Sequence, residues 1–156
     1  MIDVLAAQVG QALKAAGAKL ATAESCTGGW VAQSLTSIAG SSDWFERGYV
    51  TYSNAAKQED LGVPARTLEG HGAVSEETAR AMATGALKKT GADATVAVTG
   101  IAGPGGGSPA KPVGTVCFAW VRGGKIRSET KRFDGDRESV RRQSVIHALQ
   151  GVLELL

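Results

Sequence analysis

The chain has 156 residues, of which 43% are hydrophobic and 21% charged, as in an ordinary globular domain. A net charge of +2 and an aromatic content of 5% argue against a surface that binds nucleic acid. The two cysteines supply no disulfide framework, and no apolar run resembles a membrane span or a secretion signal. We therefore expect a single cytoplasmic domain over residues 1–156.

Helical and extended patterns alternate along the chain. The expected elements are, in order, a helix from about Val4 to Gly17, a strand at 19–24, a helix at 27–38, a strand at 48–52, a short helix capped by Asn54 and ended by Gly62 and Pro64, a helix from Ser75 to Gly91, a strand at 94–99, a hairpin of 113–121 and 125–133, and a last helix capped by Asp134 or Asp136. This alternation with one hairpin predicts an α/β fold, a three-layer α/β/α sandwich with a mixed, mostly parallel sheet.

The segment at residues 23–29, Ala-Glu-Ser-Cys-Thr-Gly-Gly, lies where a strand meets a helix. Here Ser25 would be exposed as a nucleophile, Thr27 would cap the helix, and Gly28 and Gly29 would bring bare backbone to a substrate. Cys26 is a rival nucleophile, because a thiol at a helix N-terminus can have a lowered pKa. An ordinary capped strand–helix turn has the same composition.

A loop rich in glycine and proline, residues 100–112, follows an apolar strand, the place where open α/β sheets bind ligands. It is not a phosphate-binding P-loop, because Gly106 stands where the lysine is required. Nor is it a dinucleotide fingerprint, because Pro109 and Pro112 forbid the following helix. A backbone cradle for an anionic or planar ligand and a flexible connection both remain open.

A nucleophilic serine needs a base, and the chain offers few. His71 is expected in a turn and His147 within the last helix, neither with an evident carboxylate partner, so a Ser-His-Asp triad or a zinc site has no support. Lys57 is the remaining candidate, because burial would favour a neutral amine able to take the Ser25 proton. A lone lysine on a short helix is also typical of solvated surface.

Five segments, in this order along the chain, resemble the CinA C-terminal-domain family, which contains stand-alone nicotinamide-nucleotide amidohydrolases. They are residues 23–29, residues 48–54 with Lys57, residues 71–75, residues 99–105 and residues 111–116. The resemblance spans about residues 5 to 150. It implies the same three-layer fold and a homo-oligomer, dimeric or larger.

The resemblance also implies a Ser-Lys amidase acting on nicotinamide mononucleotide. Ser25 would attack the carboxamide carbon, Lys57 would accept its proton and pass one to the departing ammonia, and Tyr52 would orient Lys57. Water would then release nicotinic acid mononucleotide. Independently of the resemblance, we infer that backbone N–H groups near Thr27, Gly28 and Gly29 would stabilise the oxyanion.

The same resemblance implies that one pocket holds the substrate. Its expected lining is Thr99, Gly100, Gly103 and Gly105, with Arg141, or else Arg142 or Arg137, pairing with the phosphate. No metal and no organic cofactor is implied.

Two other functions stay open. One is a non-catalytic, nucleotide-binding regulatory module related to competence and damage-inducible proteins, and the other is an amidase for a different carboxamide. Ammonia release from nicotinamide mononucleotide discriminates among the three.

Overall fold

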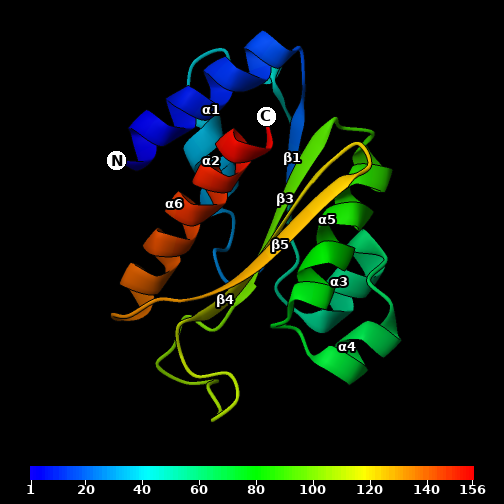
Figure 1. Cartoon of the computed structure of the whole chain (residues 1–156), viewed down its shortest axis with the longest axis vertical. Coiled ribbons are helices and arrows are strands. Elements are labelled where there is room, and N and C mark those ends of the chain that lie inside the picture. The colour runs from blue at the N-terminus through cyan, green and yellow to red at the C-terminus, as the bar shows by residue number, and fades with distance from the viewer.

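Five strands form one sheet in the computed structural model, which describes all residues from Met1 to Leu156 (Figure 1). They are β1 (Leu20–Glu24), β2 (Phe45–Val50), β3 (Ala94–Gly100), β4 (Thr115–Arg122) and β5 (Lys125–Arg132), in the spatial order β2-β1-β3-β4-β5. β1 is parallel to both of its neighbours, whereas β4 is antiparallel to both of its own. The predicted mixed sheet is confirmed, with parallel and antiparallel pairs in equal number.

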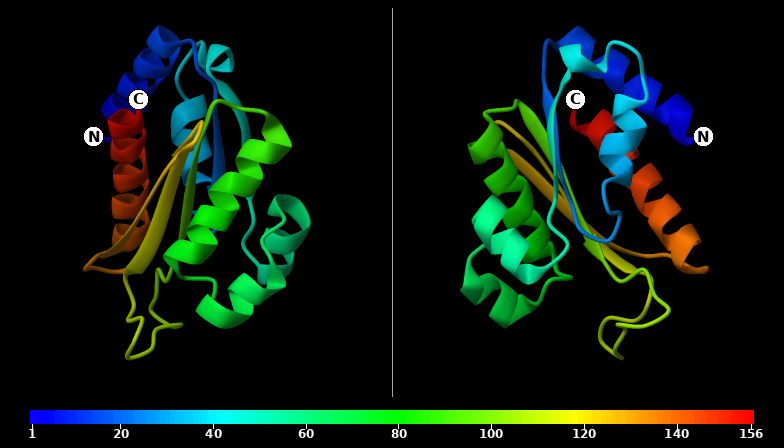
Figure 2. Two further views of the ribbon diagram at one scale, coloured as in Figure 1. Left: turned by 45° about the vertical axis from the view of Figure 1, so that its right-hand side comes forward. Right: turned by 180° about the vertical axis from the view of Figure 1, so that it is seen from behind.

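Helices cover both faces of the sheet, which confirms the three-layer α/β/α sandwich (Figures 1 and 2). One face carries α1 (Ile2–Ala16), α2 (Trp30–Thr36) and α6 (Arg137–Leu155), and the other carries α3 (Asn54–Leu61), α4 (Ala65–His71) and α5 (Glu76–Thr90). A 3₁₀ turn, η1 (Ser41–Asp43), precedes β2. No helix combines the length and the apolar composition that crossing a bilayer requires.

The middle of the sheet is buried from both sides, and its carboxyl edge positions the candidate site. β1 is buried at every residue, and so is β3 up to Thr99. Because Glu24 pairs with Val98 in the parallel register, Ser25, which follows β1, lies beside Thr99, near the end of β3. The chain then turns towards β2 after β1 and towards β4 after β3. Ligands bind in open α/β sheets where neighbouring connections diverge in this way.

Several element boundaries differ from the sequence-based expectations. The strand expected at 48–52 begins earlier and ends earlier, as β2, because its pairing with β1 starts at Phe45. Ser53, rather than Asn54, caps α3, since its hydroxyl accepts from the Ala56 N–H at 3.0 Å. The sequence reading missed α4 altogether, because Pro64 looks like the end of a helix but is the N-cap of the next one.

A close approach of α5 to α3 depends on Gly85. A Cβ at this position would collide with the carbonyl oxygen of Leu61, the last residue of the helix that carries Lys57. We expect Gly85→Ala to lower the free energy of unfolding by about 1–3 kcal/mol, the usual cost of overpacking, as measured by urea denaturation. Gly70→Ala is the matched control, because Gly70 also lies in a helix but has open space around its Cβ. An equal stability of Gly85→Ala and wild type would contradict the expectation.

Candidate active site

The two residues expected to carry the chemistry meet at the carboxyl end of β1. Ser25 directly follows the strand, and its N–H donates to the Val98 carbonyl at 2.9 Å, which extends the β1–β3 pairing by one residue. Lys57 comes from the middle of α3, on the face of the sheet that also carries α4 and α5. Its Nζ lies 3.1 Å from Ser25 Oγ. Two side chains 32 residues apart in the sequence are therefore in hydrogen-bond contact.

The Lys57 amine is enclosed by backbone carbonyls. The residue is 1% exposed, and its Nζ donates to the carbonyls of Thr51 at 3.0 Å and Tyr52 at 3.2 Å. Burial lowers the pKa of Lys57 below its usual value. A neutral amine has two N–H donors and one lone pair. Nζ also donates to Ser25 Oγ, and Ser25 Oγ in turn lies 3.4 Å from the Tyr52 carbonyl, to which it donates. A neutral amine that keeps its two N–H groups on the carbonyls would turn its lone pair to the Ser25 hydroxyl, as a proton acceptor requires.

Cys26, the rival nucleophile, lies next to Ser25 but in a different electrostatic environment. Burial, followed by the negative charge of Glu24, raises the pKa of the Cys26 thiol to about 12. The thiol is therefore protonated at neutral pH, whereas nucleophilic cysteines have lowered pKa values. This favours Ser25 over Cys26 as the attacking group.

The turn after Ser25 is built on a buried carboxylate that the sequence reading did not single out. Glu24 Oε1 accepts from the Thr27 hydroxyl at 2.6 Å and from the Val31 N–H at 2.9 Å. Its Oε2 accepts from the Ala32 N–H at 3.0 Å. The prediction that Thr27 caps the helix is wrong, since α2 begins only at Trp30 and Glu24 satisfies its first free donors. The N-terminus of α2 is thus already occupied by an anion.

Two glycines give this turn its shape. Gly28 and Gly29 have φ values of 60° and 101°, in the left-handed region that other residues avoid. The Gly28 N–H donates back to the Ser25 carbonyl at 3.0 Å. The N–H groups of Cys26, Thr27 and Gly29, by contrast, donate to no backbone carbonyl, although the Cys26 N–H contacts the thiol of its own residue. Two of these backbone donors, those of Cys26 and Thr27, lie directly after the candidate nucleophile.

A cavity of about 200 Å³ contains the Ser25–Lys57 pair. Its lining residues are Ser25, Cys26, Tyr52, Asn54, Lys57, Ala73, Val74, Thr99, Gly100, Ala102 and Arg137. Thr99 is held in place by its hydroxyl, which donates to the Ala73 carbonyl at 2.9 Å. The cavity is thus formed where β1, β3, α3 and the beginning of α6 come together.

The structure places only part of the expected lining at this cavity. Thr99 and Gly100 line it, as the sequence predicts, whereas Gly103 and Gly105 do not. Gly103 instead offers its carbonyl to the Arg137 guanidinium at 2.7 Å. Gly105 lies exposed further along the loop. Thr27, Gly28 and Gly29, which belong to the turn after Ser25, are also outside the lining.

Tyr52 contacts Lys57 through its backbone rather than its ring. Its carbonyl accepts from Lys57 Nζ, while its hydroxyl accepts from Arg137 Nη2 at 3.3 Å. The Tyr52 residue is 62% exposed. The residue therefore joins the buried amine to an arginine at the mouth of the cavity.

The three candidate arginines of α6 have different positions. Arg141 donates to the carbonyls of Cys26 and Thr27, both at 3.1 Å, and does not line the cavity. Arg142 pairs with Glu138 at 3.1 Å on the exposed side of the helix. Arg137 alone lines the cavity. Arg141, which the resemblance predicts to pair with the phosphate, thus binds the turn, and Arg137, one of the two fallback candidates, faces the cavity.

Known proteins agree with this architecture. The sequence family described as the CinA C-terminal domain matches residues 2–156. The chain belongs to this family. It is 56% identical over 154 residues to the nicotinamide-nucleotide amidohydrolase PncC of Pseudomonas putida, covering 99% of this chain and 96% of that protein. It is 59% identical over 147 residues to PncC of Escherichia coli K12, covering 94% and 89% of the two chains.

A solved structure of this family has the same fold. The competence/damage inducible protein CihA from Agrobacterium tumefaciens superposes with a TM-score of 0.96 at 47% identity, covering 99% of this chain and 94% of that one. The strand order and helix layers described above are therefore those of the CinA family.

In this CinA domain both histidines have a carboxylate partner, contrary to the expectation from sequence. His71 Nδ1 lies 3.4 Å from Glu77, and His147 Nε2 lies 3.1 Å from Glu129. Neither histidine lines the cavity of Ser25 and Lys57. No three His, Cys, Asp or Glu side chains lie close enough together to hold a metal ion.

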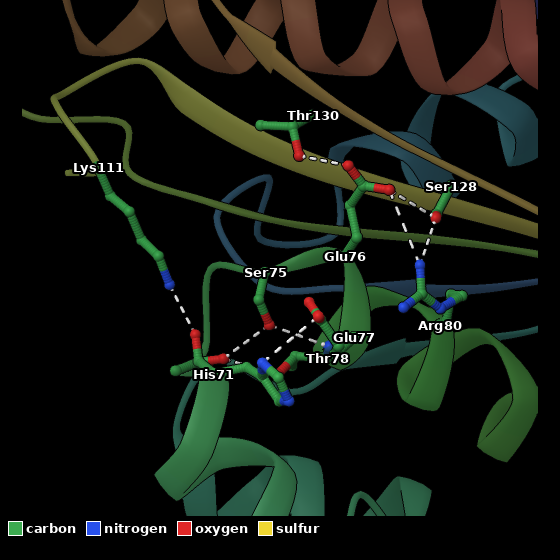
Figure 3. A network of polar contacts seen from close by, with 10 residues as sticks. His71, Ser75, Glu76, Glu77, Thr78, Arg80, Lys111, Ser128 and Thr130 are labelled. Carbon is green, nitrogen blue, oxygen red and sulfur yellow. Dashed lines mark hydrogen bonds and ion pairs between the residues drawn. The ribbon is translucent and has the colours of Figure 1, made fainter.

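A second, larger cavity of about 680 Å³ lies between the N-terminus of α5 and the ends of β4 and β5 (Figure 3). Two charged side chains that line this cavity, Glu76 and Lys111, form hydrogen bonds with other residues of the chain. Glu76 accepts from Ser128 at 2.7 Å and from Thr130 at 2.8 Å, and these hydrogen bonds lower the pKa of its carboxyl. Lys111 donates to the His71 carbonyl at 2.6 Å. This network joins α5 to β5 and ties the glycine-rich loop to α4.

Proposed function

We propose that this protein hydrolyses the carboxamide of nicotinamide mononucleotide, releasing ammonia and nicotinic acid mononucleotide. The observation that carries the chemistry is the 3.1 Å contact between Ser25 Oγ and the buried Lys57 Nζ inside the cavity. A serine beside a desolvated lysine is an attested nucleophile–base pair. The substrate follows from the nicotinamide-nucleotide amidohydrolases, which share more than half of their residues with this chain.

In the first half of the reaction, the Lys57 amine takes the Ser25 proton as Oγ attacks the carboxamide carbon. A C–O bond forms, and the carbonyl π electrons move onto oxygen to give a tetrahedral oxyanion. The Lys57 ammonium then returns its proton to the amide nitrogen as the C–N bond breaks. Ammonia leaves, and the acyl group remains on Ser25 as an ester.

The oxyanion needs donors that do not already serve the fold. The Ser25 N–H is engaged by Val98, and the first N–H groups of α2 are engaged by Glu24. The free N–H groups of Cys26 and Thr27 are the nearest donors left along the chain. A single donor of this kind stabilises the transition state by about 3–4 kcal/mol.

In the second half of the reaction, water hydrolyses the acyl ester on Ser25. Lys57, again neutral, takes a proton from water as the water oxygen attacks the ester carbon. The tetrahedral intermediate collapses, the C–O bond to Ser25 breaks, and the serine recovers its proton from the ammonium. The product carboxylic acid ionises and leaves.

The phosphate of the substrate is assigned to Arg137, at the mouth of the cavity. We expect Arg137→Gln to raise KM for nicotinamide mononucleotide about 10-fold or more, since a charge-assisted hydrogen bond contributes about 1.5–3 kcal/mol. KM for the dephosphorylated nucleoside should stay within about twofold. Arg142→Gln is the matched control, because Arg142 pairs with Glu138 on the exposed side. An equal change of KM for both substrates would show that Arg137 does not bind the phosphate.

The direct test of the function is ammonia release from nicotinamide mononucleotide by the purified protein. Turnover at micromolar to millimolar substrate is expected. Saturable binding without ammonia would indicate a regulatory nucleotide-binding module instead. Faster turnover of an unrelated carboxamide would support an amidase activity but show that nicotinamide mononucleotide is not the preferred substrate.

A further inference from the structure

The turn after Ser25 is held from two sides by groups that touch no substrate space. Glu24 lies beneath it, buried to 1% exposure, and binds the Thr27 hydroxyl together with the start of α2. Arg141 reaches across from α6 and donates to the carbonyls of Cys26 and Thr27. The guanidinium also lies over the Trp30 ring, 5.5 Å from its centroid. Both side chains are therefore fixed by several partners at once.

These contacts set the direction of the two free donors. In a trans peptide the C=O and the following N–H point in opposite directions. Arg141 binds the Cys26 carbonyl, so the Thr27 N–H of the same peptide plane points away from the guanidinium. The Gly28 N–H binds the Ser25 carbonyl and fixes the plane that carries the Cys26 N–H in the same way. Arg141 thus orients a donor that it does not contact.

Glu24 removes competing donors. The Glu24 carboxylate accepts from the Val31 and Ala32 N–H groups in the first turn of α2, which no intrahelical carbonyl can serve. Through the Thr27 hydroxyl it also anchors the residue whose N–H is free. Both effects leave the N–H groups of Cys26, Thr27 and Gly29 as the available donors of the turn, and the first two lie next to Ser25.

We infer that Arg141 and Glu24 are positioning residues, which orient the backbone donors of the oxyanion site by clamping the turn from opposite sides. The inference rests on the proposed function, since it assigns these residues a part in the same reaction. It also gives Arg141 a role other than phosphate binding.

Arg141→Lys separates the two roles. Lysine keeps the charge but lacks the planar fork that reaches two carbonyls at once. We expect kcat to fall about 10–100-fold, because small misplacements of catalytic groups cost this much. KM should stay within about twofold, and the loss should be equal for nicotinamide mononucleotide and for its nucleoside. A rise in KM confined to the phosphorylated substrate would overturn the inference, as would unchanged kinetics. Arg142→Lys is the matched control, because Arg142 lies on the same helix and also over the Trp30 ring, at 5.3 Å, but pairs with Glu138 and binds neither carbonyl of the turn.

Glu24→Gln tests the other side of the clamp, since it keeps the shape of the side chain and removes its charge. A similar fall in kcat is expected. The double variant Glu24→Gln with Arg141→Lys should lose less than the product of the two single effects, because both side chains hold one turn. Fully multiplicative losses would contradict a shared role. If thermal denaturation shows that Arg141→Lys is unfolded, the same comparison of kcat and KM is made with Arg141→Gln and Glu24→Gln.

A second readout separates this inference from the proposed function. The burst of p-nitrophenol from p-nitrophenyl acetate reports acylation of Ser25 without the nucleotide. Wild type that shows the burst but releases no ammonia from nicotinamide mononucleotide would refute the proposed substrate and still allow the clamp to be tested. A slower burst in both variants then supports the inference, and an unchanged burst overturns it.

Discussion

Replacing Ser25 with alanine is expected to abolish ammonia release, with kcat lowered at least about 10⁴-fold, as for other covalent nucleophiles. The variant keeps the cavity and the free backbone donors but has no oxygen to form the acyl ester. The substrate should still bind, so KM or a directly measured Kd should change little. A steady-state ammonia assay with isothermal titration of the same variant checks both expectations.

Cys26→Ala is the matched control for Ser25→Ala. It removes the neighbouring thiol, leaves the Cys26 backbone N–H in place, and is expected to keep kcat within about tenfold, since the backbone donors are retained and only a small rearrangement of the turn is expected. The raised pKa of the Cys26 thiol, about 12, leaves almost no thiolate at neutral pH. Loss of activity in Cys26→Ala with retention in Ser25→Ala would reverse the assignment.

Replacing Lys57 with methionine is expected to lower kcat about 10²–10⁴-fold, the usual contribution of a general base. Methionine fills a similar volume without a titratable group. Lys57→Arg should not restore activity, because guanidinium does not give up its proton at any pH used for proteins. Activity in Lys57→Arg close to that of wild type would show that a positive charge, rather than a base, is required at this position.

The pH dependence of wild type follows from the lowered pKa of Lys57. Burial favours the neutral amine, so the base becomes active at a lower pH than an exposed lysine. Below that pKa the amine is protonated, and kcat/KM should fall about tenfold per pH unit. Above it the rate should level off. Lys57→Met should lose this acidic limb, and a wild-type rate that declined with rising pH through this range would contradict the base assignment.

The sequence identified Ser25 and Lys57 as candidates, but neither their contact nor the groups that support them could be derived from it. Strand–helix alternation places Ser25 at a strand end, and the family resemblance points to Lys57. Glu24 escapes such reasoning, because a glutamate inside an apolar strand gives no sign that its carboxylate will cap a helix seven residues later. Its role depends on the three-dimensional path of the turn, which two left-handed glycines determine.

The arginines of α6 illustrate the same limit. Arg137 and Arg141 are one helical turn apart, so periodicity puts them on one face and does not distinguish them. Which of them reaches the cavity depends on where α6 begins relative to β1 and the 100–112 loop. Likewise, β2 starts at Phe45 because β1 offers a pairing edge there, a tertiary fact that local propensity does not contain.

The acceptors that surround the Lys57 amine are main-chain oxygens of Thr51 and Tyr52. Every amino acid at those two positions supplies the same carbonyl, so sequence drift there leaves the proton affinity of the amine largely untouched. Related proteins can therefore vary the side chains around their base, and with them the shape of the substrate they admit, without retuning the group that starts the reaction.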